Sequence, residues 1–95
     1  MRAELSEVAR SEFREARRFF AGRSEQVAIR FSRAVRDCLD RVEAYPEANE
    51  LTSDGITRRA VVRRFPSVIL YEMTADRLIV TSIFHTSRRP RDDQH

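Results

Sequence analysis

The first half of the chain carries apolar residues at the spacing typical of helices. A first stripe, three or four positions apart, consists of Ala9, Phe13, Ala16 and Phe20. Ser6 precedes this stripe as a capping residue and Gly22 follows it as a stop signal. A second stripe between Ser24 and Pro46 consists of Ala28, Phe31, Val35, Cys38, Leu39 and Val42. The pattern therefore predicts two helices joined by the short turn 21–23, which together form a helical hairpin.

After a polar loop from Pro46 to Gly55 the apolar period changes to two. Three segments rich in Val, Ile, Phe and Tyr follow, at Thr57–Phe65, Ser67–Thr74 and Arg77–Thr86. Their connections are short, which favours antiparallel pairing, and residues 2–5 are a candidate opening strand. The predicted order is β-α-α-β-β-β. This is an α+β fold in which the hairpin packs on one face of a small, mainly antiparallel sheet.

The length and composition indicate one domain. The 95 residues leave no room for a second core, so we expect a single domain at residues 1–90 and a polar tail at 91–95. Apolar runs are far shorter than the ~18 residues of a membrane span, so no membrane partner is expected. The single cysteine, Cys38, excludes an internal disulfide and fits a cytoplasmic location. Motifs for metal, nucleotide or acyl chemistry are missing, so no metal site and no cofactor is expected.

The basic charge is concentrated in one segment. All 18 basic residues are arginine, and 15 acidic residues reduce the net charge to +3. The densest cluster is Arg58, Arg59, Arg63 and Arg64, on the first strand after the loop. Alternation places Arg59 and Arg63 on one face and the other two on the opposite face. The cluster is either an anion-binding surface for nucleic acid or an acidic peptide, or a solvated strand whose charges resist aggregation.

The last predicted strand ends at His85, which is followed by Arg88 and Arg89. Such a histidine can act as a general acid/base with phosphate-binding neighbours. Alternatively, it hydrogen-bonds the loop and anchors the C-terminal segment. The spacing indicates no second catalytic partner, which favours the structural role.

Three segments together resemble the RelE/ParE superfamily of toxins from type II toxin–antitoxin modules, in particular its ParE-like, plasmid-stabilisation branch. The first is Ala9-x-x-Glu12-Phe13-x-Glu15-Ala16-x-x-Phe19-Phe20, and the second runs from Phe31 through Val42 to Tyr45-Pro46. The third is Arg58-Arg59 with Arg64-Phe65-Pro66-x-x-Ile69-x-Tyr71, then Leu78-Ile79-Val80 and His85-x-x-Arg88-x-Pro90. The resemblance covers about residues 5–90 and implies the fold order already read from periodicity.

The resemblance implies a bacterial toxin that a cognate antitoxin neutralises, by one of two mechanisms. RelE-like members cleave mRNA on the ribosome, whereas ParE-like members inhibit DNA gyrase by contact. Many mRNA-cleaving relatives carry an arginine where this chain has Val68, and some carry an aromatic residue where it has Thr86. The lysines that others use are absent as well. These departures favour the ParE-like, non-enzymatic reading.

We therefore expect a toxin with an antitoxin partner and a gyrase target. The residues expected to face the antitoxin or the target are Arg58, Arg59, Arg63, Arg64, His85, Arg88 and Arg89. One alternative is a ribosome-dependent mRNA endonuclease in which His85 is the acid/base and Arg64 stabilises phosphate. Another is a non-toxic basic binding module that kept the fold.

Overall fold

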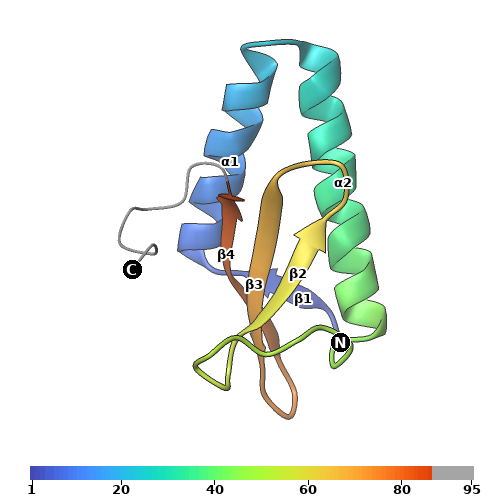
Figure 1. Cartoon of the computed structure of the whole chain (residues 1–95), viewed down its shortest axis with the longest axis vertical. Coiled ribbons are helices and arrows are strands. Elements are labelled where there is room, and N and C mark those ends of the chain that lie inside the picture. The colour runs from blue at the N-terminus through green and yellow to red at the C-terminus, as the bar shows by residue number, and fades with distance from the viewer. Residues whose placement is uncertain (87–95) are drawn as a thin grey trace.

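Six elements follow one another in the order that the pattern predicts. A computed structural model describes residues 1–86 of the chain (Figure 1). The elements are β1 (Ala3–Leu5), α1 (Glu7–Ala21), α2 (Glu25–Ala44), β2 (Arg58–Val62), β3 (Ser67–Met73) and β4 (Leu78–His85). The helices form an antiparallel hairpin behind the sheet (Figure 1), which confirms the predicted α+β architecture. Arg88, Arg89 and the expected tail at 91–95 lie outside the described residues.

The four strands form one sheet in the order β1-β4-β3-β2. The strands β2, β3 and β4 pair antiparallel, as predicted from their short connections. The opening strand β1 pairs parallel with β4, because the helical hairpin returns the chain to the same end of the sheet. The sheet is therefore mixed, and its two edge strands are β1 and β2.

The sequence signals at the helix ends act as expected. The Ser6 hydroxyl accepts a hydrogen bond from the Ala9 N–H (3.1 Å), and the Ser24 hydroxyl accepts one from the Val27 N–H (3.4 Å). Both serines thus satisfy a donor that the first turn of a helix leaves unpaired. At the end of α1 the Gly22 N–H donates to the Arg18 carbonyl (3.1 Å).

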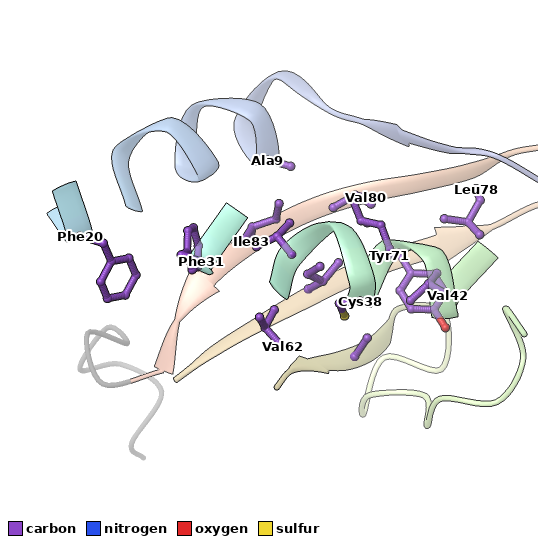
Figure 2. Packing of buried hydrophobic residues seen from close by; sticks show 14 of the residues in the cluster. Ala9, Phe20, Phe31, Cys38, Val42, Val62, Tyr71, Leu78, Val80 and Ile83 are labelled. Carbon is purple, nitrogen blue, oxygen red and sulfur yellow. The ribbon is translucent and has the colours of Figure 1, made fainter. Parts of the chain in front are cut away.

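The core lies between the hairpin and one face of the sheet. Figure 2 shows side chains of both helices directed at residues of β2, β3 and β4. Phe31 is fully buried, and its ring lies 4.9 Å from that of Phe20 and 5.8 Å from that of Phe13. Tyr71 is also fully buried; its hydroxyl donates to the Pro46 carbonyl (2.8 Å) and so ties the loop after α2 to the sheet.

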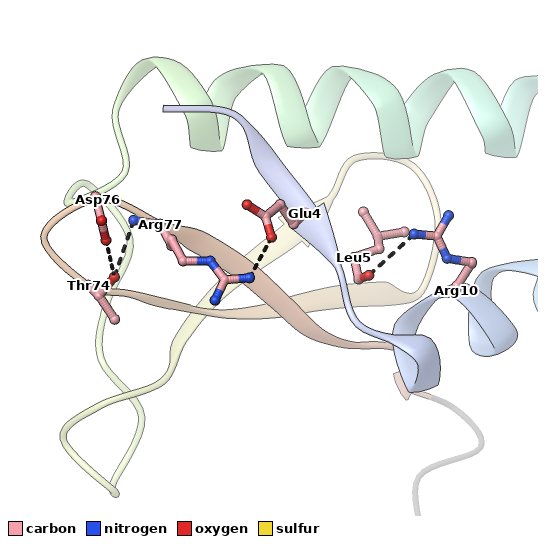
Figure 3. Close-up of polar contacts among 6 residues, drawn as sticks. All are labelled: Glu4, Leu5, Arg10, Thr74, Asp76 and Arg77. Atoms are coloured by element: carbon pink, nitrogen blue, oxygen red, sulfur yellow. Dashed lines mark hydrogen bonds and ion pairs between the residues drawn. The ribbon is translucent and has the colours of Figure 1, made fainter.

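Polar contacts hold the short strand β1 in place. Arg77, the residue immediately before β4, forms an ion pair of 2.8 Å with Glu4, and Arg10 donates to the Leu5 carbonyl over 3.4 Å (Figure 3). Both contacts are exposed and screened by solvent, so they orient β1 and add little to stability.

Beyond the end of β1, helix α1 covers the free edge of β4. A single carboxylate oxygen of Glu12 accepts hydrogen bonds from the Ser82 hydroxyl and the Ile83 N–H, each 2.8 Å long. Ile83 is a core residue, so Glu12 supplies the acceptor that a longer β1 would have provided.

One predicted strand is shorter than expected. The segment 57–65 was expected to be a strand throughout, but β2 covers only Arg58–Val62 and residues 63–66 form the turn into β3. Arg64 has a φ of 71°, a left-handed conformation that a strand cannot contain. No helix among residues 1–86 is long and apolar enough to cross a membrane.

Candidate binding surface

Arg58 is the only one of the four clustered arginines whose side chain the fold uses extensively. It lies at the start of β2 on the same face as the buried Ala60. Its guanidinium donates to the carbonyl oxygens of Asn49 (2.6 Å) and Glu47 (3.3 Å). Arg58 therefore holds the loop after α2 against the sheet, which leaves less of its guanidinium for a partner.

The other three arginines of the cluster are exposed. Arg59 lies on the face of β2 opposite Arg58, as alternation predicts. The prediction that Arg63 and Arg64 lie on opposite faces of the strand was wrong, because both follow the end of the strand and lie in the turn. Within residues 1–86, Arg64 makes no hydrogen bond or ion pair. These exposed cations are available to a partner.

His85 ends β4 inside a group of aromatic rings. Its ring centroid lies 6.0 Å from that of Phe19 and 6.0 Å from that of Phe20. Phe65, at the turn after β2, packs against Phe20 at 5.3 Å. His85 pairs with Ser67, and the Pro66 carbonyl accepts a hydrogen bond from the Thr86 N–H (2.7 Å), so this end of β4 lies beside the turn that carries Arg64. Arg88 and Arg89, expected to complete this end of the surface, lie outside the described residues.

A groove of about 530 Å³ runs between the C-terminal half of α2 and the outer edge of β2. We call it the β2-edge groove. It is lined by Cys38, Arg41, Val42, Tyr45, Ala48, Asn49, Ala60, Val61 and Arg63. Two of these residues are arginine and none is acidic, so the groove is positively charged with an apolar floor.

The polar groups of this groove meet at the backbone of Val61. The Val61 carbonyl accepts hydrogen bonds from the Arg41 guanidinium (3.3 Å) and from the Cys38 thiol (3.5 Å). Arg41 was not singled out by the sequence patterns, because its partner lies 20 residues away and depends on how α2 packs on β2. The only local signal is its position beside the apolar stripe, between Cys38 and Val42.

The thiol in the groove is unsuited to nucleophilic chemistry. Cys38 is almost fully buried, and this burial raises the pKa of its thiol, although the nearby Arg41 guanidinium opposes part of the shift. A thiol with a raised pKa carries little of the reactive thiolate at neutral pH. In the part of the chain that the structure describes, no group of His, Cys, Asp and Glu is arranged to hold a metal ion.

Comparisons with known proteins agree with this fold. The family model of the ParE toxin of the type II toxin–antitoxin system parDE matches residues 3–90. A solved structure titled "Chromosomal ParDE TA system from P. aeruginosa" superposes with a TM-score of 0.71 at 14% identity, over 90% of this chain and 95% of that one. No curated protein matches the chain. Since the family model spans nearly all of the sequence, the chain belongs to the ParE toxin family of type II toxin–antitoxin systems.

Proposed function

We propose that this chain is the active toxin of a toxin–antitoxin pair, that a cognate antitoxin neutralises it, and that it inhibits DNA gyrase by protein contact. The observation that carries the proposal is the match of the ParE toxin model to residues 3–90. Gyrase acts in the cytoplasm, so this target fits the cytoplasmic location expected from the sequence.

An apolar residue at one of the positions that matter for catalysis favours contact over catalysis. An mRNA endonuclease of this fold would need His85 as acid/base and a cation such as Arg64 beside the same phosphate. In the described structure both candidates lie at the same end of the sheet, His85 beside the rings of Phe19 and Phe20 and Arg64 in the exposed turn after β2. The position at which many mRNA-cleaving relatives carry an arginine holds the buried Val68.

The exposed cations are the proposed contacts. Arg59, Arg63 and Arg64 project from β2 and the turn after it, and they suit an acidic surface on the antitoxin or the target. His85, Arg88 and Arg89 are proposed to extend this surface at the C-terminal side. Arg58 contributes indirectly, by fixing the loop with its bonds to Glu47 and Asn49.

Purified components test the mechanism. We expect the chain to inhibit supercoiling by purified gyrase and the antitoxin to reverse this inhibition, while mRNA on translating ribosomes stays intact. Cleaved mRNA that disappears with His85→Ala would establish the endonuclease instead. Salt-sensitive nucleic-acid binding without either activity would indicate the non-toxic binding module.

A further inference from the structure

The helices cover one face of the sheet, and the opposite face carries a group of apolar residues (Figure 1). We call this opposite face the outer sheet face. Five apolar residues that alternation places on it lie outside the core cluster of residues 1–86, namely Val61, Val68, Leu70, Ile79 and Phe84. An antiparallel sheet that is covered on one side normally presents polar residues on the other. The outer sheet face therefore has the composition of a surface that a partner covers.

The pairing register aligns these residues in rows across the strands. Val61 pairs with Val68, and Val68 pairs with Phe84, so one row is apolar across three strands. Val61 is 54% exposed at one end of this row, and Phe84 is partly buried at the other. Leu70 lies in the next row, two residues further along the central strand β3. The apolar side chains thus form one continuous patch.

The two ends of the outer sheet face carry opposite charges. The turn between β2 and β3 contributes the exposed Arg63 and Arg64. At the other end of the strands (Figure 1), alternation directs Glu72 outward from β3, and Asp76 is exposed in the turn into β4. Glu72 lies about 17 Å along β3 from the first residue of the strand, so the charges of the two ends are too far apart to pair within one chain.

The acidic end keeps its charge in the free chain. Arg77, beside Asp76, is already paired with Glu4 over 2.8 Å. Among residues 1–86, Glu72 and Asp76 form no ion pair. An acidic peptide or a nucleic acid on the outer sheet face would be attracted at one end and repelled at the other. The face instead favours a partner whose charges run in the reverse order.

A second copy of the same chain is such a partner. A two-fold axis that runs across the strands reverses their direction in the other copy. The basic end of each copy then meets the acidic end of the other, and the apolar patches meet in between. This self-complementary arrangement follows from the sheet alone and requires neither an antitoxin nor gyrase.

We propose that two copies of this chain associate through their outer sheet faces, with the patch around Val68 and Leu70 at the centre and Arg64 of each copy near Glu72 of the other. Two sheets packed face to face lie about 10 Å apart, with interdigitated side chains. The seven residues of β3 span about 23 Å and the four strands about 14 Å, which gives a footprint of roughly 300 Å². Standard interfaces bury about 800 Å² per partner, so this dimer is weak and reversible.

Sedimentation velocity measures the association directly. We expect the wild-type chain to shift from monomer to dimer as its concentration rises from about 1 μM to about 1 mM. Leu70→Asp places two like charges in the centre of the patch and should weaken the association about 10-fold or more. Val8→Asp is the matched control, because Val8 is 60% exposed on α1 and lies off the outer sheet face. The control should stay within about 2-fold of wild type.

A charge exchange tests the orientation of the two copies. Arg64→Glu brings acidic residues together at both ends of the dimer, and Glu72→Arg brings arginines together there. Each variant alone should associate about 5- to 10-fold more weakly than wild type. An equimolar mixture restores both opposite-charge contacts in the heterodimer and should associate within about 3-fold of wild type. Neither side chain belongs to the core, so this test remains valid if Leu70→Asp fails to fold.

Several results would overturn the proposal. One is a wild-type chain that stays monomeric up to about 1 mM. Another is a dimer that Leu70→Asp leaves unchanged, or a mixture of the two charge variants that associates no better than either alone. A monomeric chain whose Val68 and Leu70 methyl NMR signals shift only when gyrase or the antitoxin is added would assign the face to that partner instead. All of these results leave the proposed function intact, since growth arrest and gyrase inhibition test it separately.

Discussion

The contact between Glu12 and β4 gives a prediction about stability that the structure makes quantitative. One carboxylate oxygen accepts two hydrogen bonds of 2.8 Å, from the Ser82 hydroxyl and the Ile83 N–H. The hydroxyl can rotate to another partner, but the N–H belongs to a strand whose neighbour β1 has already ended at Leu5. Glu12→Ala therefore leaves a partly buried donor without an acceptor.

The expected loss follows from the kind of bond removed. A hydrogen bond to a charged group contributes about 1.5–3 kcal/mol, and an unsatisfied buried donor costs about 1–3 kcal/mol. We expect Glu12→Ala to lower the free energy of unfolding by about 2–3 kcal/mol, which is a large fraction of the ~5–15 kcal/mol typical of a domain. Glu12→Gln keeps an oxygen acceptor and loses only the charge, so it should cost about 1 kcal/mol.

Urea unfolding followed by circular dichroism measures these differences. Glu15→Ala is the matched control, because Glu15 is exposed on the same helix and the substitution brings the same gain in helix propensity. The control should stay within about 0.5 kcal/mol of wild type. If Glu12→Ala and Glu12→Gln both fall within that range, Glu12 does not anchor α1 to β4 and the reasoning is refuted.

Three further predictions concern the loop and the groove. Tyr71→Phe should lower the free energy of unfolding by about 1–2 kcal/mol and speed hydrogen exchange in the loop after α2, because the hydroxyl's bonds to the Pro46 carbonyl and the Asn49 amide are lost; unchanged exchange would contradict this role. Hydrogen bonds from the N–H groups of Thr57 and Ile56 lower the pKa of Asp54 well below its ordinary 3.8. Its contribution to stability is therefore complete above about pH 5 and lost as the pH falls through the folded-state pKa; an NMR titration midpoint near 3.8 would disagree. Burial raises the pKa of Cys38, so a disulfide reagent should modify it slowly in the native chain and quickly in urea, and equal rates would show an accessible thiol.

Local sequence rules predicted most of the fold. The stripes through Phe20 and Phe31 identified the buried faces of both helices, and Ser6 and Ser24 marked where the helices begin. Capping and periodicity act within a few residues, so they can be read from sequence. The end of β2 could not be predicted from sequence. Arg63 and Arg64 continue a strand-like pattern, and the left-handed turn at Arg64 depends on how β2 pairs with β3.

The binding surface was predictable only in part. The sequence located the exposed arginines, Arg59 and Arg63 among them, because clustered charge is visible along the chain. The hydrogen bonds from Arg41 and Cys38 to the Val61 carbonyl depend on the packing of α2 against β2, and neither is encoded locally. For Arg58 the sequence was misleading, because it cannot be told apart from the other clustered arginines. In the structure its hydrogen bonds to the Asn49 and Glu47 carbonyls hold the loop after α2.

Growth of bacteria that express this chain tests the central claim most directly. We expect expression of the chain alone to arrest growth, and co-expression of the protein encoded beside its gene to restore it. Glu12→Ala gives an internal control, because a destabilised chain should arrest growth less at the same level of expression. Unhindered growth with abundant, folded wild-type chain would contradict the account.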